Sequence, residues 1–288
     1  MLRSMYSGIS GMRNFQTKLD VIGNNIANVN TAGFKKGRAT FQDMMSQMTR
    51  GAQAPNATRG GVNPAQVGLG SQLGSIDNIH TQGFRQTTNN PLDFALEGDG
   101  MFVVASDIGA DPTNIPLDTA SVAYTRAGNF YLDEDGSIVN PQGLYLIGFP
   151  YDTASGAIST ASHSTIQIPS TAKSFSVESN GTVTYIDQAG DTQVAGQIAL
   201  AQFSNPAGLQ KAGSNLFLNT QNAGLSANLL VPETDGVASV ISGALEMSNV
   251  DLAEEFTEMI TAQRGFQANT RIITTSDEIL QELVNLKR

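Results

Sequence analysis

The sequence predicts an α+β protein, with a helical segment at each end of the chain and an antiparallel all-β domain between them. Both terminal segments carry apolar residues at heptad spacing, whereas the middle alternates apolar and polar residues between turn signals. Two heptad helices in one chain can bury their stripes against each other, so we expect them to pair as a coiled-coil-like core domain. The alternative is that each packs on the β-domain. We place the core domain at 1–40 and 245–288, an extended linker at 41–84 and the outer β-domain at 85–244.

The N-terminal helix is predicted from two apolar series with seven-residue steps. Gly33 is placed to end this helix as a C-cap. A stripe of this kind is typical of a helix that packs on another helix, and the residues predicted to form an assembly core are Met5, Met12, Leu19, Ile22, Ile26 and Val29. The first series is Met5, Met12, Leu19 and Ile26, and the second, three residues further on, is Gly8, Phe15, Ile22 and Val29.

The end of this helix combines many asparagines with an absence of charge. No charged residue lies between Asp20 and Lys35. Asparagine is a poor helix former, and a helix that faces water usually carries Lys and Glu. Amides can be buried against protein at low cost when their partners are satisfied. We therefore predict that a polar, uncharged face contacts neighbouring copies rather than water, through Asn24, Asn25 and Asn28.

The C-terminal helix shows the same seven-residue period. Its only charges between Met259 and Ser276 are Arg264 and Arg271, which again favours contact with protein. The predicted assembly residues of this helix are Leu252, Phe256, Met259, Phe266, Ile273 and Leu280.

The middle of the chain is predicted to form antiparallel hairpins. Asn180-Gly181 and Asp135-Gly136 are strong turn signals between alternating runs, and another run breaks at Gly98 to Gly100. No ten-residue helical pattern separates these runs, which excludes a parallel sheet. Residues 50–75 are rich in Gly, Ala, Asn and Pro and are interpreted as linker.

Composition excludes several classes of function. The net charge of -10 argues against nucleic acid as a partner, and the basic cluster of Lys35, Lys36 and Arg38 is interpreted as a surface turn. No apolar run is long enough to span a bilayer, so membrane insertion is not expected. The N-terminal residues lack the apolar block of a cleaved signal peptide. There is no cysteine for a disulfide or thiolate site.

No constellation of residues predicts catalysis. His80 and His163 lie far apart among small polar residues, so we interpret them as exposed loop histidines rather than metal ligands. The sequence DEDG at 133–136 lacks the other ligands of a calcium loop and is interpreted as a turn. We therefore predict no enzyme activity, no catalytic residue, no metal and no cofactor.

Long stretches at both ends resemble one family. SGISGMRNFQTKLDVIGNNIANVNTAGFKKGRATF and SNVDLAEEFTEMITAQRGFQANTRIITTSDEILQELVNLKR are similar to the terminal signatures of bacterial flagellar axial proteins (rod, hook and hook-filament junction), and LDFALEGDGMFVV to their inner β-domain. The resemblance implies a helical homopolymer, exported by the flagellar type III apparatus without a cleaved signal peptide to an extracellular position in the flagellum. It also implies the distal rod, the hook-filament junction and the hook cap as partners.

Within that family the motifs leave two interpretations. AQRGFQANTRIITTSDEIL and the ending LVNLKR resemble hook proteins, especially those of Gram-positive type, which predicts a subunit of the flexible hook that transmits torque from rod to filament. The alternative is the distal rod, because the segment between Phe41 and about Ser75 is long, as in distal rod proteins.

Overall fold

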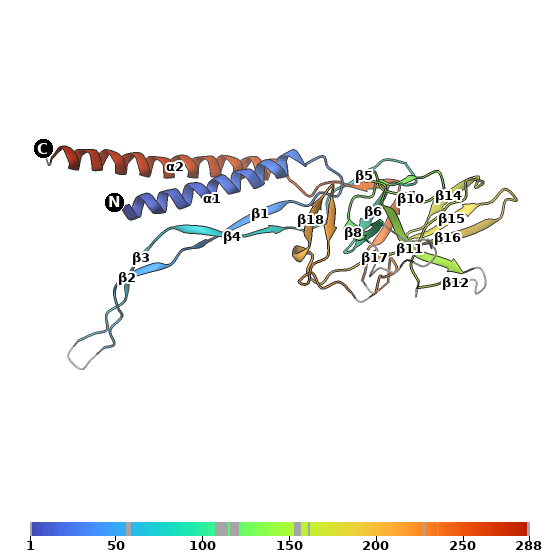
Figure 1. The fold of residues 1–288 in the computed structure, drawn as a ribbon, viewed down its shortest axis with the longest axis horizontal. Coiled ribbons are helices and arrows are strands. Elements are labelled where there is room, and N and C mark those ends of the chain that lie inside the picture. Colours follow the sequence, from blue (N-terminus) through green and yellow to red (C-terminus); the bar gives the residue numbers. More distant parts are fainter. Residues whose placement is uncertain are drawn as a thin grey trace. The chain divides into compact units, whose positions relative to one another are not determined.

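The computed structural model describes residues 2–55, 59–106, 115, 121–152, 157–160, 162–226, 228–234 and 236–286. Its mixture of two long helices and antiparallel strands confirms the predicted α+β class (Figure 1). The chain divides into two compact units. The helical unit comprises residues 1–27, 36–79 and 250–288, and the β unit comprises residues 28–35 and 80–249.

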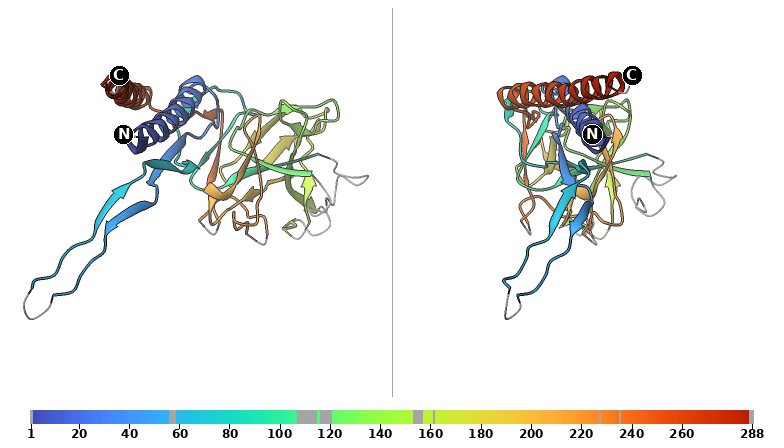
Figure 2. Two further views of the ribbon diagram at one scale, coloured as in Figure 1. Left: turned by 60° about the vertical axis from the view of Figure 1, so that its left-hand side comes forward. Right: turned by 90° about the vertical axis from the view of Figure 1, so that its left-hand side faces the viewer.

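The helical unit contains α1 (Leu2–Ala27) and α2 (Leu252–Asn285), which lie side by side and run in opposite directions (Figures 1 and 2). Glycines set their spacing. A Cβ atom on Gly8 would lie 3.3 Å from Cγ1 of Ile273, and one on Gly265 would lie 2.5 Å from Cζ of Phe15. The helices therefore approach closely at these positions, and the predicted pairing of the terminal helices with each other is confirmed.

The packed face of α2 follows the predicted period but is less apolar than expected. Counting Leu252 as heptad position a, the first four d positions are small or polar residues, and only the last, Leu283, is a large apolar residue. Three of them, Glu255, Ala262 and Ser276, are the buried residues of the helix. The helix begins at an N-cap, Asp251, whose carboxylate accepts hydrogen bonds from the amides of Ala253 and Glu254.

The end of α1 differs from the prediction. The helix stops at Ala27, so Val29 lies beyond it and Gly33 is not its C-cap. Asn28 accepts hydrogen bonds from the amide and the hydroxyl of Thr31, both at 3.1 Å. These bonds hold a turn that competes with the helix. Gly33 has a positive φ of 70° and donates its amide to the carbonyl of Glu246.

Residues 41–84 are not the extended linker that composition suggested. Most of them form a long antiparallel ribbon with β1 (Gly37–Asp43) paired to β4 (Ser71–Asn78), and β2 (Ser46–Arg50) paired to β3 (Ala65–Gly68). Gln53 and Val62, which lie between β2 and β3 in the chain, make a further antiparallel bridge. Cross-strand contacts such as the 2.7 Å hydrogen bond between the hydroxyls of Thr40 and Ser75 fix the register.

The β unit is built from short strands, most of which belong to one antiparallel sheet. Its described path runs in the order β14-β15-β16-β11-β7-β8-β19-β18. These strands are β7 (Met101–Ser106), β8 (Ser121–Thr125), β11 (Tyr145–Asp152), β14 (Ser174–Val177), β15 (Thr182–Ile186), β16 (Thr192–Ile198), β18 (Gln210–Gly213) and β19 (Leu216–Leu218).

Shorter strands join the side of this sheet. They are β9 (Tyr131–Leu132), β10 (Ile138–Val139), β12 (Ala157–Ile158), β13 (Ser164–Thr165) and β17 (Leu200–Ala201), and a 3-10 turn, η1, covers Pro206–Gly208. The turns predicted at Asp135-Gly136 and Asn180-Gly181 are confirmed. Gly136 and Gly181 both adopt a φ of 76° between paired strands.

The break at Gly98 to Gly100 does not make the expected hairpin. β6 (Phe94–Glu97) pairs with β20 (Ser239–Ser242), and β5 (Arg85–Thr87) pairs with β21 (Ala244–Glu246). β7 instead pairs with β8, β11 and β17. The strands before and after this break therefore belong to different ladders, a choice that local alternation does not encode.

The core of the β unit lies on both faces of β7. Phe102 and Val104 belong to one buried cluster with Phe94, Phe130 and Ile198. Alternate residues of the same strand, including Val103, belong to a second cluster with Phe149 and Phe217. Because both faces are covered, β7 is a continuous apolar run rather than an alternating one.

Candidate assembly interface

The predicted assembly residues fall into two groups in the helical unit. One group, called the packed group here, is half-buried or buried, whereas the other remains exposed although it follows the same period. The packed group is Met5, Met12, Leu19, Ile22, Ile26, Met259, Ile273 and Leu280, and the exposed group is Leu252, Phe256 and Phe266. Val29 is half-buried in the segment after α1.

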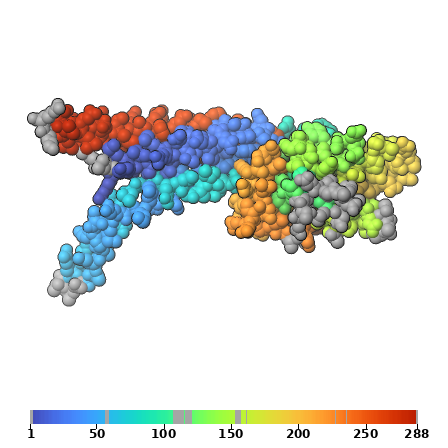
Figure 3. Space-filling model, in the orientation of Figure 1, coloured from blue at the N-terminus to red at the C-terminus, as the bar shows by residue number. Residues whose placement is uncertain are grey.

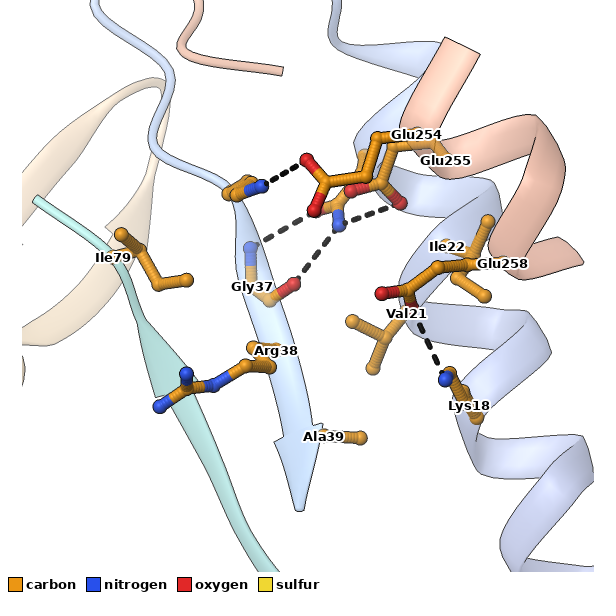
Figure 4. A pocket seen from close by; sticks show the side chains of 12 residues that line it. Lys18, Val21, Ile22, Gly37, Arg38, Ala39, Ile79, Glu254, Glu255 and Glu258 are labelled. Carbon is orange, nitrogen blue, oxygen red and sulfur yellow. Dashed lines mark hydrogen bonds and ion pairs between the residues drawn. The ribbon is translucent and has the colours of Figure 1, made fainter. Parts of the chain in front are cut away.

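Asn25 is buried within its own chain, at 1% exposure, and does not lie on a face open to other copies. Its side-chain amide donates to the carbonyl of Gly37 at 2.9 Å and accepts from the amide of Gly37 at 3.0 Å. It also donates to Oε2 of Glu255 at 3.2 Å (Figure 4). The side chain thus acts like a strand partner for β1 while it joins α1 to α2, which corrects the interface role expected for it.

The other two asparagines differ in position. Asn24 is exposed on α1, and Asn28 lies in the turn that follows the helix. The three amides therefore do not form one face, because α1 ends before Asn28. Any contact of Asn24 with another copy stays a prediction.

Charged residues surround the Asn25 contacts. Lys18 pairs with Glu258 at 3.1 Å and Lys36 with Glu254 at 2.9 Å, beside a cavity of about 260 Å³ (Figure 4). Burial raises the pKa of Glu255, and the Asn25 hydrogen bond and the Lys36 charge offset this only in part. Position 25 therefore requires an uncharged side chain, because a charge there would face the Glu255 carboxylate.

A second group of buried charges lies in the β unit. Lys35 is 1% exposed, and its ammonium lies 2.6 Å from Oε1 of Glu246, while Arg126 lies 3.0 Å from Oε2 of the same carboxylate. Backbone groups complete the cluster: Lys35 donates to the carbonyl of Thr81, Arg126 donates to that of Gly98, and Glu246 accepts from an amide at position 83. The prediction of a surface turn at Lys35 was wrong.

The cluster keeps its charges through mutual contact. Burial acts to raise the pKa of Glu246, but the positive charges of Arg126 and Lys35 outweigh it and hold the pKa below its usual value. Burial lowers the pKa of Lys35, with the Glu246 carboxylate acting in the opposite direction. The chain passes from one unit to the other at several points, and each of three residues near the cluster lies within four residues of such a point: Lys35, Thr81 and Glu246. The cluster therefore fixes the ends of the segments that lead to α1, the ribbon and α2.

The histidines are not exposed loop residues, which corrects a second prediction. Both ring nitrogens of His80 are buried, and within the described residues they make no hydrogen bond. The ring packs on Phe217, 5.5 Å between centroids, beside a cavity of about 180 Å³. Burial, together with the charges of Lys35, Arg126 and Lys211, lowers the pKa of His80 to about 4. Nδ1 of His163 is likewise buried, beside Phe149.

We expect His80 to make the β unit sensitive to acid. A folded pKa of about 4 lies below the unfolded value of 6.5, so the unfolded chain binds the proton first. The stability contributed by the neutral ring is complete above pH 6.5 and is lost as the pH falls toward 4. The full shift corresponds to about 3 kcal/mol. Thermal unfolding of the parent and of His80→Phe at pH 7 and pH 4.5 measures it, and an equal acid loss in both proteins would contradict the assignment.

The described part of the chain offers neither a cluster of metal ligands nor a membrane-spanning helix. No group of three or more His, Cys, Asp or Glu residues there could hold a metal ion. Neither described helix is long and apolar enough to cross a bilayer.

Comparisons with known proteins show which family the chain resembles. Three family models match it: the flagella basal body rod protein over residues 5–35, the flagellar hook protein FlgE/F/G D1 domain over 95–185, and the flagellar basal body rod FlgEFG protein C-terminal over 241–286. The chain is 53% identical to the flagellar basal-body rod protein FlgG of Bacillus subtilis, over all of both chains. It is 36% identical to FlgG and 31% identical to the flagellar hook protein FlgE of Borreliella burgdorferi, again over all of each chain.

A solved structure, the flagellar hook protein FlgE2 of Helicobacter pylori, matches 65% of this chain and 47% of its own length at 14% identity, with a TM-score of 0.23.

The family models and the relatives define the class of the protein, a structural protein of the bacterial flagellum. The full-length relatives identify which one: the chain belongs to the flagellar rod and hook protein family FlgE/F/G and is a structural component of the flagellar axis. The predicted family is confirmed.

Proposed function

We propose that this protein is a subunit of the distal rod of the flagellar basal body, where copies polymerise through the helical unit into a tube. The observation that carries this proposal is the 53% identity to a basal-body rod protein along the whole of both chains. This identity favours the rod over the hook. The long segment after Phe41 also suggested the rod, whereas the terminal motifs suggested the hook.

A comparison within one organism supports the rod. The alignment with FlgG of Borreliella burgdorferi spans 293 positions, close to the 288 residues of this chain. The alignment with FlgE of the same organism spans 456 positions. A hook protein of that length carries sequence for which this chain has no counterpart. The hook remains the second candidate, favoured by the resemblance of the terminal motifs.

The mechanism requires no catalytic site. Apolar contacts of α1 and α2 with other copies would hold the tube, while the β unit provides a folded body stabilised by its own two-sided core. Export by the flagellar type III apparatus without a cleaved signal peptide, an extracellular position and contacts with the hook, the hook-filament junction and a cap belong to this proposal. The ordered ribbon of β1 to β4 fits a stiff rod better than a flexible linker would.

Localisation in purified hook-basal bodies tests the assignment. We expect an epitope inserted after Pro55, in the segment between β2 and β3, to label only the rod segment below the hook in electron micrographs. Deletion of the chain should leave basal bodies without a distal rod and without hooks. Label along the length of the hook would overturn the rod assignment in favour of the hook. Untagged basal bodies serve as the control.

A further inference from the structure

Residues 28–35, called the strap here, join the β unit from a distant part of the chain. They belong to that unit, although residues 36–79 separate them from the rest of it. The strap contains no helix and no strand. Phe34 in the strap is buried, at 8% exposure, yet it is a member of neither buried cluster on β7. The strap therefore packs beside the two cores of the β unit and does not complete either of them.

The end of the strap places a lysine in a buried site. The Lys35 side chain is 1% exposed, and its ammonium donates to the carboxylate of Glu246 at 2.6 Å and to the carbonyl of Thr81 at 2.7 Å. Glu246 has partners other than this lysine, because it also accepts from Arg126 at 3.0 Å and from the amide of Gly83 at 2.9 Å. The β unit thus holds acceptors for one ammonium group, and Glu246 stays paired when that group is absent.

The two residues before this lysine are also recognised individually. Gly33 has a φ of 70° and donates its amide to the carbonyl of Glu246 at 2.8 Å. A Cβ atom at this position would lie 2.5 Å from the amide nitrogen of Ala127, so a side chain is excluded. The ammonium of Lys211 lies 4.8 Å from the centre of the Phe34 ring, a cation–π contact. The site therefore fits the sequence Gly-aromatic-Lys.

The hairpin of β18 and β19 holds the strap through its polar side chains. The Lys211 ammonium donates to the carbonyl of Lys35 at 3.2 Å, and the Asn215 amide donates to the carbonyl of Ala32 at 2.9 Å. Strand β18 is exposed at every residue and ends the path of the sheet, on the surface of the β unit (Figure 3, orange). These contacts can open without breaking the pairing of the inner strands.

We propose that the β unit carries a recognition site for a Gly-Phe-Lys peptide. The strap fills this site in its own chain, and the same peptide added in solution fills it when the strap is undocked. Most of the described contacts are made by side chains, and they lie outside the two cores, as for a peptide bound to a folded domain. Tethering gives the strap a high effective concentration, so a free peptide competes only with a weakened strap. The proposal goes beyond the proposed function and does not depend on it.

Peptide binding to the full-length chain tests the proposal. Gly33→Val should undock the strap, because a β-branched side chain disfavours a positive φ and would overlap Ala127. A fluorescent peptide with the sequence of residues 28–35, NVNTAGFK, should then bind saturably in an anisotropy titration. We expect it to bind the parent chain about a hundredfold more weakly, because the tethered strap occupies the site. The same peptide carrying Lys35→Met should lose about tenfold in affinity, because a hydrogen bond to a charged group is lost.

The matched control is Val103→Ala, which destabilises one core of the β unit and leaves the strap intact. It should not bind the peptide, whereas a chain that is merely loosened would do so. Adding Asn215→Ala to Gly33→Val should weaken peptide binding, since the contact with the Ala32 carbonyl is lost. No binding to a folded Gly33→Val chain, or binding that does not depend on the lysine of the peptide, would overturn the proposal.

His80 reports docking of the strap separately from stability. Burial and then the charge of Lys35 lower its pKa to about 4. Undocking removes this charge, so in Gly33→Val the pKa should rise toward 6.5, and addition of the peptide should lower it again. The chain has two histidines, so an NMR titration resolves each ring. A pKa in Gly33→Val that the peptide does not change would count against docking at this site.

Hydrogen exchange of the parent chain decides the matter if Gly33→Val does not fold. The amide of Gly33 should exchange about a hundredfold faster than those of Phe102 and Val104, because the strap opens while the cores stay closed. Exchange of Gly33 only at the rate of global unfolding would show that the strap is an inseparable part of the β unit, and the proposal would then be wrong.

Discussion

Glu246→Gln is expected to lower the unfolding free energy of the β unit by about 3–5 kcal/mol, the range measured when one partner of a buried ion pair is removed. The substitution keeps the shape of the side chain but leaves the charges of Lys35 and Arg126 buried together, 2.6 Å and 3.0 Å from atoms that no longer carry a negative charge. Loss of this much stability is a large part of the total for a typical domain. Thermal and denaturant unfolding of the purified chain measure it.

The matched control is Glu254→Gln, which removes an ion pair with Lys36 at a similar distance of 2.9 Å. The Glu254 side chain is largely exposed, so we expect a change below about 1 kcal/mol. Lys35→Met, Arg126→Met, Glu246→Leu should recover part of the loss, because it removes the charges together. Equal effects of Glu246→Gln and Glu254→Gln would show that the buried cluster does not hold the β unit.

Asn25→Asp should destabilise the helical unit by about 2–4 kcal/mol and prevent incorporation into axial structures. The introduced carboxylate can still accept from the amide of Gly37, but it cannot donate to the Gly37 carbonyl or to Glu255. An unsatisfied buried acceptor costs about 1–3 kcal/mol, and more when it is charged. A second carboxylate also lies beside Glu255, whose pKa is already raised by burial. Hydrogen exchange of the α1 amides measures the loss.

Gln16→Glu adds the same charge to an exposed position of α1 and should leave exchange and assembly nearly unchanged. The acid dependence provides a further check. Carboxyls whose folded pKa is raised destabilise the fold above their unfolded pKa, so the penalty of Asn25→Asp should shrink as the pH falls toward 4. A variant that exchanges and assembles like the parent would show that the Asn25 contacts do not hold α1 in place.

Local pattern was sufficient for the existence of the two helices and for two of the turns in the β unit. Seven-residue steps predicted both helices and their pairing, because apolar residues at that spacing form one helix face that a second helix of the same period can bury. Turn residues such as Gly136 and Gly181 marked strand ends, because few other residues accept a positive φ there. The long signatures at both ends predicted the family.

Predictions from the sequence were less reliable where the structure depends on polar side chains or on contacts between residues that are far apart in the chain. The Gly-rich composition of 50–75 suggested linker, but strand pairing across the ribbon overrides weak local propensity. Lys35 looked like a surface lysine because its partner, Glu246, lies 211 residues away. His80 looked polar and exposed because nothing nearby in the chain indicates the Phe217 ring that covers it.

The α+β class, the paired terminal helices and the membership of the flagellar rod and hook family follow from the sequence, since heptads, turn residues and family signatures are local features of the chain. The role of Asn25, by contrast, depends on the elements that surround it in the fold. An amide next to Gly37 and Glu255 is an internal hydrogen-bonding partner, whereas the same amide on an uncovered face would be available to another copy. The period of a helix fixes which residues share a face, but the partner of that face is fixed by elements that are far away in the chain.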